Sequence, residues 1–577
     1  MLTTRRARRR RLAFSLLTGV GLLAMALVAW VAAAPTAHAQ GQRRAGYDLC
    51  PANARLTSSQ STPPAQFAQV IHVPADYPTI QAAVNAAPAN TLILVAPGVY
   101  HEAVRVCSSD LTIRGEDRNG TVLDGQSKLT NGFTVLADNV ILENMTAHHY
   151  LGNGFYWDDM TGYRGSYLTA WDNGDYGIYA FGSTKGEFDR SYASGSPDSG
   201  FYIGQCFPCD AIINDVRSEW NGLGYSGTNA GGNLVIENSE WDQNSAGIVP
   251  NTLDSEGGPP QRGATLIHNY VHDNGNAKAP YTVWAHIPLG TGILVAGGDK
   301  DYVVDNRVEN NPDYGILVLG NIDQNFWIAS GNVVERNQVK GSGIADLALG
   351  APTGANNCFA DNQATTTLPP LLEVTHACGT PLPLNGGGDF SITLRLFAND
   401  VNAGLTSPGP SYQPPDWRKI PAPPAQANMP NATSAPPAPI FVDAFPAGTT
   451  SANGFAPITN TYTPGGSAMF LPVGLTSYSL VQILLSLYGN LLLFALYAAW
   501  LAVGFVDLAH RDELSVGKRF GWGALLVGVP FIGPILYYFA SGSKLSTRFR
   551  LGLVFGAPAL CLVVTVLLLV VASFTLL

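Results

Sequence analysis

The chain of 577 residues is long enough for several domains, but only 13% of its residues are charged and 62 are glycine. Its formal net charge of −10 hides an asymmetry, because residues 1–39 carry +6, residues 507–577 carry +3, and the stretch between them carries −19. A stretch this acidic repels nucleic acid at low salt, and it argues against polyuronates such as pectate or alginate as ligands unless Ca²⁺ bridges the two. No nucleic-acid partner is expected.

The amino terminus is typical of a secretory signal. Six arginines precede an apolar run from Leu12 to Ala34, and Ala37-His-Ala39 has the small-x-small pattern of a cleavage site. Residues 1–39 are therefore predicted to be a signal peptide, which places the next domain on the extracytoplasmic side of the cell membrane. The apolar run is long for a signal, so an uncleaved anchor stays open as an alternative.

A short amphipathic helix is predicted to begin the main domain, after a polar lead segment over residues 40–69. Pro78 stands at its start, and Ile80, Ala83 and Val84 follow at helical spacing. Such a helix can cover the end of a solenoid, whose first coil otherwise exposes core side chains and unpaired strand edges.

One short signal repeats through the centre of the chain: a glycine, an apolar residue, and a second apolar residue two places further on. Its early steps are 22, 23 and 23 residues, and no helical pattern lies inside it. A fixed period of this size is typical of a solenoid, so we predict a β-solenoid domain over residues 70–399. The repeat glycines are Gly132, Gly154, Gly177, Gly200, Gly247, Gly292 and Gly315.

Asparagine or serine recurs in a second register, after an apolar strand. In stacked coils these side chains are predicted to form one line, in which each amide bonds the turn backbone of a neighbouring coil. The alternative is a set of surface loops rich in Asn and Gly. The positions are Asn144, Ser166, Ser191, Asn214, Asn238, Asn269, Asn306, Asn332 and Asn357.

The beginning of the main domain carries a family resemblance. The sequence YPTIQAAVNAAPANTLILVAPGVYHEAVRV resembles the start of the right-handed parallel β-helix proteins of the pectin-lyase-like superfamily, and the 23-residue coils resemble their repeats over roughly residues 70–362. The resemblance implies an all-β, right-handed parallel β-helix with an N-terminal capping helix. It implies no particular activity, because the superfamily holds lyases, hydrolases, esterases, epimerases and non-enzymatic members.

Six of the seven cysteines fall between residues 50 and 378, an even number in a part of the chain predicted to be exported to an oxidising compartment. We predict the disulfides Cys50–Cys107, Cys206–Cys209 and Cys358–Cys378, although spacing does not prove the pairing. Cys206-Phe-Pro-Cys209 could instead be a redox motif.

Three tyrosines are the candidate ligand-binding residues. Tyr156, Tyr179 and Tyr202 occupy the second position after three consecutive repeat glycines, which points outward on a strand. Stacked on coils about 4.8 Å apart, they could form a flat aromatic face that lies against sugar rings. Alternatively, the stacked rings only stabilise neighbouring strands.

Four aspartates are the catalytic candidates: Asp158, Asp159, Asp175 and Asp198. Asp175 and Asp198 each precede a repeat glycine by two residues, so they are predicted to lie in matching turns of neighbouring coils. Such a pair raises the pKa of one carboxyl or holds a cation such as Ca²⁺, and cleavage of a glycosidic bond needs two carboxylates. The alternative is that they are ordinary turn residues.

Histidines are weaker candidates. His148-His149 lies at a predicted turn, and His268 and His272 bracket another, but no Met- or Cys-rich set accompanies them. We therefore predict no metal site and no cofactor, apart from the Ca²⁺ considered above.

The C-terminal part is predicted to be a linker followed by a membrane anchor. Residues 400–478 are rich in Pro, Ser, Thr, Gly and Ala, which favours an extended linker, with a small β module near residues 440–471 as the alternative. Residues 479–577 contain about three apolar segments, each long enough to span a membrane. They are residues 481–506, 521–539 and 551–577.

The first two apolar segments have a resemblance of their own. Asp507, Arg511-Asp-Glu-Leu, Trp522 and the stretch from Pro530 to Tyr537 resemble the two-helix membrane module that precedes phospholipase D-type cardiolipin synthases. The paired His-x-Lys catalytic motif of those enzymes is absent, so the resemblance implies only an anchor.

Three hypotheses for function follow. The first is a membrane-anchored extracytoplasmic protein that binds cell-surface or environmental glycans through the three tyrosines. The second is a polysaccharide lyase or glycoside hydrolase that uses the four aspartates. The third is a structural or adhesive surface spacer. The predicted anchor and the absence of the superfamily's known catalytic motifs favour the first.

Overall fold

A computed structural model of the chain describes residues 50–51, 54–58, 65–282, 285, 288–379, 387–403, 414–439, 477–478, 496–497, 499–511, 513–528 and 532–556. The predicted signal peptide lies outside the described residues, as do parts of the predicted linker and anchor.

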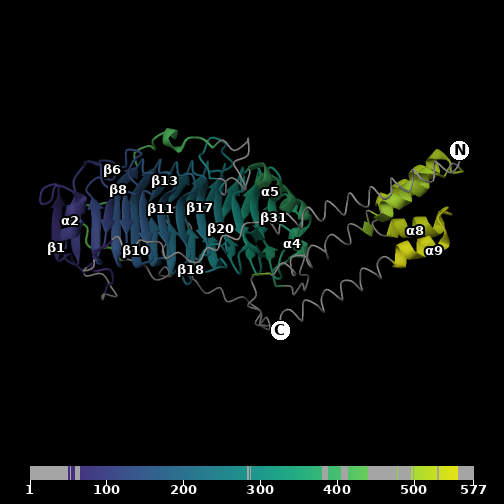
Figure 1. Cartoon of the computed structure of the whole chain (residues 1–577), viewed down its shortest axis with the longest axis horizontal. Helices are drawn as coiled ribbons and strands as arrows, with labels where there is room; N and C mark the ends of the chain where they lie inside the picture. Colours follow the sequence, from purple (N-terminus) through teal and green to yellow (C-terminus); the bar gives the residue numbers. More distant parts are fainter. Residues whose placement is uncertain are drawn as a thin grey trace. The chain divides into compact units, whose positions relative to one another are not determined.

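The main domain is a parallel β-helix with three faces, and its strands stack coil on coil (Figure 1). Two of the three faces merge into one 20-stranded sheet, because the long strands β8 and β10 cross a corner and pair on both sides of it. Face A comprises β1 (Gln69–Val73), β2 (Thr91–Val95), β5 (Leu111–Gly115), the first parts of β8 (Val140–His148) and β10 (Thr161–Trp171), β12 (Thr184–Asp189), β15 (Ala211–Asn214), β18 (Gly231–Glu237), β21 (Arg262–Ile267), β24 (Tyr302–Val304), β29 (Val333–Glu335) and β32 (Cys358–Ala360).

Face B follows the corner. It comprises β3 (Gly98–Tyr100), β6 (Thr121–Asp124), the last parts of β8 and β10, β13 (Tyr192–Ser194), β16 (Arg217–Glu219), β19 (Glu240–Asp242), β22 (Tyr270–His272), β25 (Arg307–Glu309) and β30 (Gln338–Lys340). Face C, an 11-stranded sheet, comprises β4 (Val104–Val106), β7 (Phe133–Val135), β9 (Phe155–Asp158), β11 (Tyr176–Phe181), β14 (Ser199–Gly204), β17 (Leu223–Thr228), β20 (Ala246–Asn251), β23 (Ile293–Ala296), β26 (Tyr314–Leu319), β31 (Ala345–Leu349) and β33 (Thr367–Leu368). The short strands β27 (Asn321–Ile322), β28 (Phe326–Trp327) and β34 (Ser477–Tyr478) pair antiparallel.

Close approach of neighbouring coils explains the recurring glycines. A Cβ atom on Gly154 would lie 2.8 Å from the carbonyl oxygen of Gly177, and one on Gly177 would lie 2.6 Å from that of Gly200. Only glycine lets the backbones come this close. The residue after each repeat glycine points inward and is 0% exposed, as in Phe133, Phe155, Ile178, Phe201, Ile248, Ile293 and Ile316.

Helix α2 (Ile80–Ala86) packs at the first coils, as predicted. The hydroxyl of Thr79 caps its N-terminus by accepting a hydrogen bond from the backbone N–H of Ala82 at 3.1 Å. The helix therefore covers core side chains that the first coil would expose. Its buried side chains are Ile80, Ala83 and Val84.

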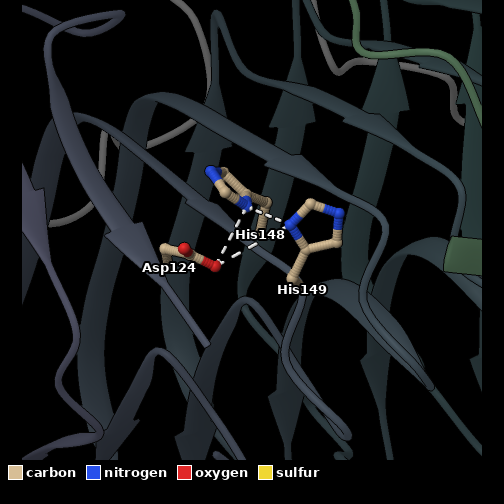
Figure 2. Close-up of side chains that lie close together, drawn as sticks. All are labelled: Asp124, His148 and His149. Carbon is tan, nitrogen blue, oxygen red and sulfur yellow. Dashed lines mark hydrogen bonds and ion pairs between the residues drawn. The ribbon is translucent and has the colours of Figure 1, made fainter. Parts of the chain in front are cut away.

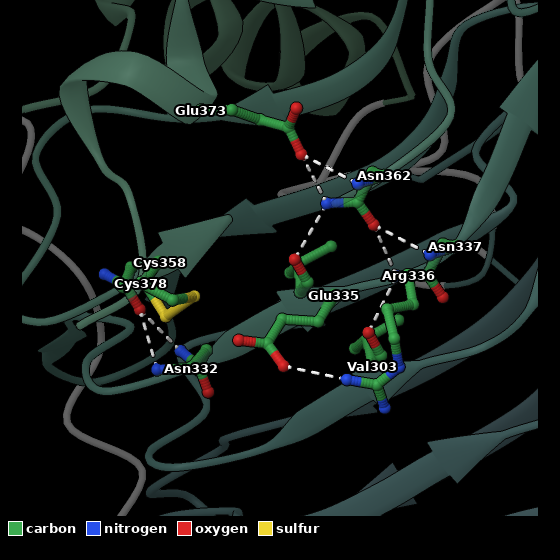
Figure 3. Close-up of a disulfide and its surroundings, with 11 residues drawn as sticks. Val303, Asn332, Glu335, Arg336, Asn337, Cys358, Asn362, Glu373 and Cys378 are labelled. Atoms are coloured by element: carbon green, nitrogen blue, oxygen red, sulfur yellow. Dashed lines mark hydrogen bonds and ion pairs between the residues drawn. A yellow bond between two sulfur atoms is a disulfide. The ribbon is translucent and has the colours of Figure 1, made fainter. Parts of the chain in front are cut away.

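Buried asparagines form ladders, of which one runs to the last coil (Figure 3). Asn269 donates from Nδ2 to Oδ1 of Asn306 at 3.1 Å, Asn306 donates to Asn337 at 3.0 Å, and Asn337 donates to Asn362 at 2.9 Å. Asn362 in turn donates to the Glu373 carboxylate at 2.8 Å, which gives the last amide a partner. Each amide thus satisfies polar groups that the stacked coils bury.

The prediction of a single line of nine polar residues was wrong. Asn332 donates to Asn357 at 2.8 Å in a ladder at a different corner, and Asn214 lies on face A beside Asp189. The sequence analysis also missed a further ladder, which is formed by Asn221, Asn244, Asn274 and Asn311. A repeat length fixes the step between coils, but it does not say at which corner of the coil a residue lies.

All three predicted disulfides form: Cys50–Cys107, Cys206–Cys209 and Cys358–Cys378. The last joins β32 to the residues that follow helix α4 (Leu372–Thr375), next to the end of the asparagine ladder (Figure 3). Helix α5 (Phe390–Ala403) places Ile392 and Leu396 against outward apolar side chains at the C-terminal end of face C.

Part of the predicted linker lies on the β-helix. We call residues 414–439, which include the short 3₁₀ helix η2 (Trp417–Lys419), the strap. Three arginines of the β-helix donate to its main-chain carbonyls, so the strap is held through its backbone. The contacts are Arg118 Nη1 to Ala427 O at 3.1 Å, Arg114 Nη1 to Ala432 O at 3.1 Å and to Ala435 O at 2.8 Å, and Arg164 Nη1 to Pro439 O at 2.8 Å.

The described C-terminal residues form α7 (Val516–Gly528), α8 (Ile532–Ala540), α9 (Thr547–Leu551) and the π-helix η3 (Gly552–Gly556). Among the helices that the structure describes, none has the length and apolarity needed to cross a membrane. Much of the first and third predicted spans lies outside the described residues.

Candidate functional site: a corner groove on the β-helix

The three tyrosines predicted to bind a ligand lie in register on face C. Ring centroids are 4.8 Å apart between Tyr156 and Tyr179 and 4.7 Å apart between Tyr179 and Tyr202. Their side chains are only 7, 5 and 2% exposed, and they cluster with Tyr176 and Phe181. A sugar stacks on an accessible ring face, and these rings leave little of one, so the arrangement fits strand stabilisation better. Their ligand-binding role stays a prediction.

The structure separates the four candidate aspartates into two pairs. Asp175 and Asp198 lie in matching turns, where the backbone N–H of Asp198 donates to the carbonyl of Asp175 at 3.1 Å. Asp158 and Asp159 lie at the other end of the face C strands, roughly 20 Å away for six residues at 3.3 Å per residue. Burial, and then the Asp175 carboxylate, raises the pKa of Asp198 to about 8, although a hydrogen bond from Tyr176 opposes the shift.

Replacing Asp198 with asparagine is expected to flatten the pH dependence of stability. The folded pKa of about 8 lies above the ordinary value of 3.8, so the proton on Asp198 contributes stability that is complete below about pH 4 and is lost as the pH rises through 8. Urea unfolding at pH 5 and pH 9 measures how much unfolding free energy is lost between these two pH values. That loss should be smaller for Asp198→Asn than for the wild type. The exposed Asp361→Asn serves as the control, and equal losses in wild type and Asp198→Asn would contradict the prediction.

A column of mostly polar side chains runs along the outward side of face B. It takes one residue from each of nine successive coils: Asp124, His148, Trp171, Ser194, Glu219, Asp242, His272, Glu309 and Lys340. These residues alternate with inward side chains such as Trp241 and Val271, which are 0% exposed. The column therefore carries the outward half of each strand, although Ser194, Asp242 and Glu309 are themselves buried by their neighbours.

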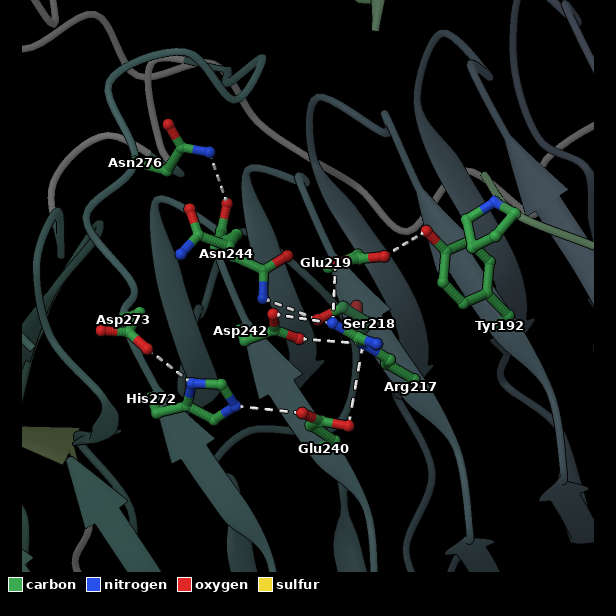
Figure 4. Close-up of polar contacts among 12 residues, drawn as sticks. Tyr192, Arg217, Ser218, Glu219, Glu240, Asp242, Asn244, His272, Asp273 and Asn276 are labelled. Atoms are coloured by element: carbon green, nitrogen blue, oxygen red, sulfur yellow. Dashed lines mark hydrogen bonds and ion pairs between the residues drawn. The ribbon is translucent and has the colours of Figure 1, made fainter. Parts of the chain in front are cut away.

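Arg217 is the centre of a charged network on this face (Figure 4). Its Nε lies 3.2 Å from Oδ1 of Asp242 and its Nη2 lies 3.0 Å from Oδ2, so the contact is bidentate. The same Nη2 lies 3.0 Å from Glu219, whose other oxygen accepts a hydrogen bond from the Tyr192 hydroxyl at 2.6 Å. Glu240 lies 3.7 Å from Arg217 Nε.

His272 extends the network between two carboxylates. Its Nε2 lies 3.1 Å from Glu240 and its Nδ1 lies 2.8 Å from Asp273 (Figure 4). Burial lowers the pKa of His272, but these hydrogen bonds outweigh it and raise the pKa overall. The Tyr270 ring stacks on the imidazole at a centroid distance of 3.9 Å, and the Arg307 guanidinium lies 4.5 Å from the same Tyr270 ring.

Two neighbouring carboxyls in this network have pKa values shifted in opposite directions. The hydrogen bond from His272 lowers the pKa of Glu240, whereas burial raises that of Asp242 against the effect of Arg217. One ligand atom each of Glu240, Asp242 and His272 lies within 4.8 Å of the others. Carboxyls that differ in this way can supply an acid and a base.

A groove of about 850 Å³ runs along the corner between faces A and B, beside this network. One rim consists of corner residues with positive φ, one from each of seven coils: Tyr167, Arg190, Asp215, Asn238, His268, Asp305 and Arg336. The other rim consists of Arg217, Glu240, Tyr270, Arg307 and Gln338. Seven coils extend over roughly 29 Å at 4.8 Å a step, so the groove has the shape to hold an extended chain.

The lining of the groove mixes both signs of charge. It contains five arginines and three carboxylates. Further carboxylates that are not part of the lining form ion pairs with two of those arginines, Asp242 with Arg217 and Glu309 with Arg307. Hydroxyl groups accept from guanidinium and donate to carboxylate. The lining therefore suits a polyhydroxylated neutral ligand, whereas a polyanion would meet the paired carboxylates.

The strap closes one end of the groove. Gln426 and Ala427 belong to the lining, and Arg118 reaches them from the β-helix. Arg118 is 3% exposed and donates only to uncharged oxygens, among them the Thr169 hydroxyl at 2.8 Å and the carbonyl of Arg190 at 3.1 Å. Burial lowers its pKa to about 10.

The sequence analysis did not single out Arg217, Glu240 or Asp242. A usable signal was present, because Ser191, Val216 and Ser239 lie at one corner position and the residue after each one points outward. Aligning each coil on that corner position would have identified the residues of the groove rim and of the column beside it.

Comparison with known proteins supports the fold. A family model described as "Right handed beta helix region" matches residues 250–368, which agrees with the predicted right-handed parallel β-helix. No curated protein matches the chain.

Three similar solved structures have TM-scores below 0.5. The A-module of the mannuronan C-5 epimerase AlgE4 from Azotobacter vinelandii is 15% identical, with a TM-score of 0.38, and the match covers 49% of this chain and 89% of that one. An alginate lyase from Paenibacillus sp. str. FPU-7 is 15% identical, with a TM-score of 0.34 and coverage of 52% and 99%. DFA-IIIase from Arthrobacter chlorophenolicus A6 is 11% identical, with a TM-score of 0.35 and coverage of 54% and 96%. Likenesses this distant carry no argument about activity.

Proposed function

We propose that the protein binds an extended neutral glycan in the corner groove. The observation that carries the proposal is the groove, which continues over seven coils and presents guanidinium, carboxylate and amide groups. Two tyrosines, Tyr167 and Tyr270, lie in different parts of the lining. Polar groups of this kind bond sugar hydroxyls, and aromatic rings pack on sugar faces. The predicted signal peptide and the apolar C-terminal segments of the sequence support a place for the protein at the cell membrane, with the β-helix on the extracytoplasmic side.

The test is retention of a panel of neutral and acidic polysaccharides by the full chain. Both Tyr270→Ala and Arg217→Ala are expected to weaken retention of a neutral glycan by about 10-fold, equivalent to about 1.4 kcal/mol. Tyr179→Ala, on face C, is the matched control, because it removes a tyrosine from the other candidate site. Loss of retention in Tyr179→Ala with full retention in Tyr270→Ala would place the ligand on the tyrosine line instead.

The opposite pKa shifts of Glu240 and Asp242 support hydrolysis of the bound glycan as a second candidate function. In that role Glu240, which lines the groove, would act as the base or nucleophile. Asp242 would donate a proton to the leaving oxygen after Arg217, which pairs with its carboxyl behind the lining, turns toward the ligand. The same incubations, scored for new reducing ends, distinguish binding from cleavage. Cleavage should fall by about 10²- to 10⁴-fold in Asp242→Asn, and cleavage that persists unchanged in that variant would reject this assignment.

A further inference from the structure

A second group of side chains lies in the same column of face B, several coils before the charged network. Asp124, His148 and His149 come together where β6 and β8 end, and their side chains point toward one another (Figure 2). The Nδ1 atoms of the two histidines are 2.7 Å apart, and Oδ1 of Asp124 lies 3.6 Å from one and 3.8 Å from the other. None of these residues takes part in the corner groove.

We propose that Asp124, His148 and His149 bind a divalent first-row transition metal ion such as Zn²⁺, through Oδ1 of the aspartate and the Nδ1 atoms of both histidines. Imidazole and carboxylate are the ligand types that zinc takes in proteins, with bonds of about 2.0–2.2 Å. In tetrahedral geometry such ligand atoms lie about 3.4 Å apart. The three observed separations bracket that value, so small ring rotations complete the geometry.

The surroundings hold the two imidazoles in place. The Trp171 ring packs at centroid distances of 4.5 Å from His148 and 4.9 Å from His149. The side chains of His148 and His149 are 14% and 28% exposed, so an ion can enter from solvent. His101, whose Nδ1 lies 3.6 Å from the second oxygen of Asp124, stands beside the three ligands at the edge of the site.

An independent observation behind the histidines supports the assignment. Asp172 is 1% exposed, and its Oδ1 atom is buried without a hydrogen-bond partner. Its Oδ2 lies 3.8 Å from Nε2 of His149, the ring nitrogen that faces away from the proposed ion. A metal-bound histidine commonly donates its other N–H to a carboxylate, so the position of Asp172 is that of an orienting partner.

The test uses the full chain, freed of metal by a chelator and then equilibrated with Zn²⁺. After removal of free ion, metal analysis should find one zinc ion fewer per chain in His148→Ala than in the wild type, and the same loss in Asp124→Asn. His72→Ala, which changes an exposed histidine on β1, is the matched control and should keep the wild-type content. Co²⁺ substitution adds a spectroscopic readout, because the visible bands of the bound ion should disappear in the same variants.

Two further variants separate the alternatives. Asp172→Asn should weaken zinc binding by about 10- to 100-fold without abolishing it, as expected for an orienting residue. His272→Ala checks the Glu240, Asp242 and His272 cluster, which also brings three ligand atoms together. Wild-type zinc content in both His148→Ala and Asp124→Asn, or a wild-type chain that retains no zinc, would overturn the proposal. Zinc lost only in His272→Ala would overturn it as well.

Discussion

Replacing Arg114 with methionine is expected to destabilise the β-helix by about 3–5 kcal/mol. The Arg114 side chain is 0% exposed, and its Nε donates to the Glu143 carboxylate, itself 1% exposed, at 2.7 Å. Methionine fills a similar volume but leaves Glu143 as a buried charge without this partner. An uncompensated buried charge accounts for most of the free-energy cost of breaking a buried ion pair. Chemical denaturation followed by circular dichroism measures the loss.

The same substitution is expected to loosen the strap. Arg114 donates to the carbonyls of Ala432, Ala435 and Pro436, so its loss removes three of the contacts that hold residues 414–439 on the β-helix. Limited proteolysis should therefore cut the strap faster in Arg114→Met than in wild type.

Two comparisons isolate the role of the ion pair. Arg105→Met changes an exposed arginine and should alter stability by less than about 0.5 kcal/mol. The double variant Arg114→Met with Glu143→Leu should recover part of the loss, because it removes both charges together. A loss below about 1 kcal/mol in Arg114→Met would contradict the prediction.

Replacing Asn306 with alanine is expected to cost about 3 kcal/mol or more, because it interrupts the asparagine ladder. The Asn306 amide oxygen accepts from the backbone N–H of Asn269 at 3.0 Å and from its side chain at 3.1 Å. Its Nδ2 donates to the carbonyl of Leu266 at 2.9 Å and to Asn337 at 3.0 Å. Alanine leaves several buried polar groups without partners, each at about 1–3 kcal/mol.

Asn85→Ala, at an exposed position of helix α2, is the control and should change stability by no more than about 0.5 kcal/mol. Equilibrium unfolding in urea compares the two variants. Equal stability of Asn306→Ala and wild type would mean that water or a shifted neighbour replaces the ladder amide.

The repeat of the β-helix could be predicted because its causes are local. Glycine is required where one backbone closely approaches the next, as at Gly177. An apolar residue is required where a strand points a side chain into the core, as at Ile178. Both signals recur with the coil length. The capping helix was predictable for a similar reason, because its amphipathic spacing is local. The disulfide pairs were predicted without proof from spacing, and the structure confirms them.

The candidate site could not be predicted in the same way. Arg217, Asp242 and His272 come from three different coils, and the coils differ in length because of insertions, so the residues that meet are decided by strand register. The accessibility of the tyrosine line also depended on packing, because spacing alone predicted an open face where the rings are nearly covered.

The sequence by itself thus determined the period, the inward side chains and the first cap of this protein, because each follows from residue type at fixed spacing. Only the tertiary structure decided which corner each asparagine occupies and where the strap docks. It also decided which polar side chains of face B meet, His148 and His149 with Asp124 and His272 with Glu240. The physical reason is that stacking brings together residues from different coils, and their separation along the chain varies with the loops between them.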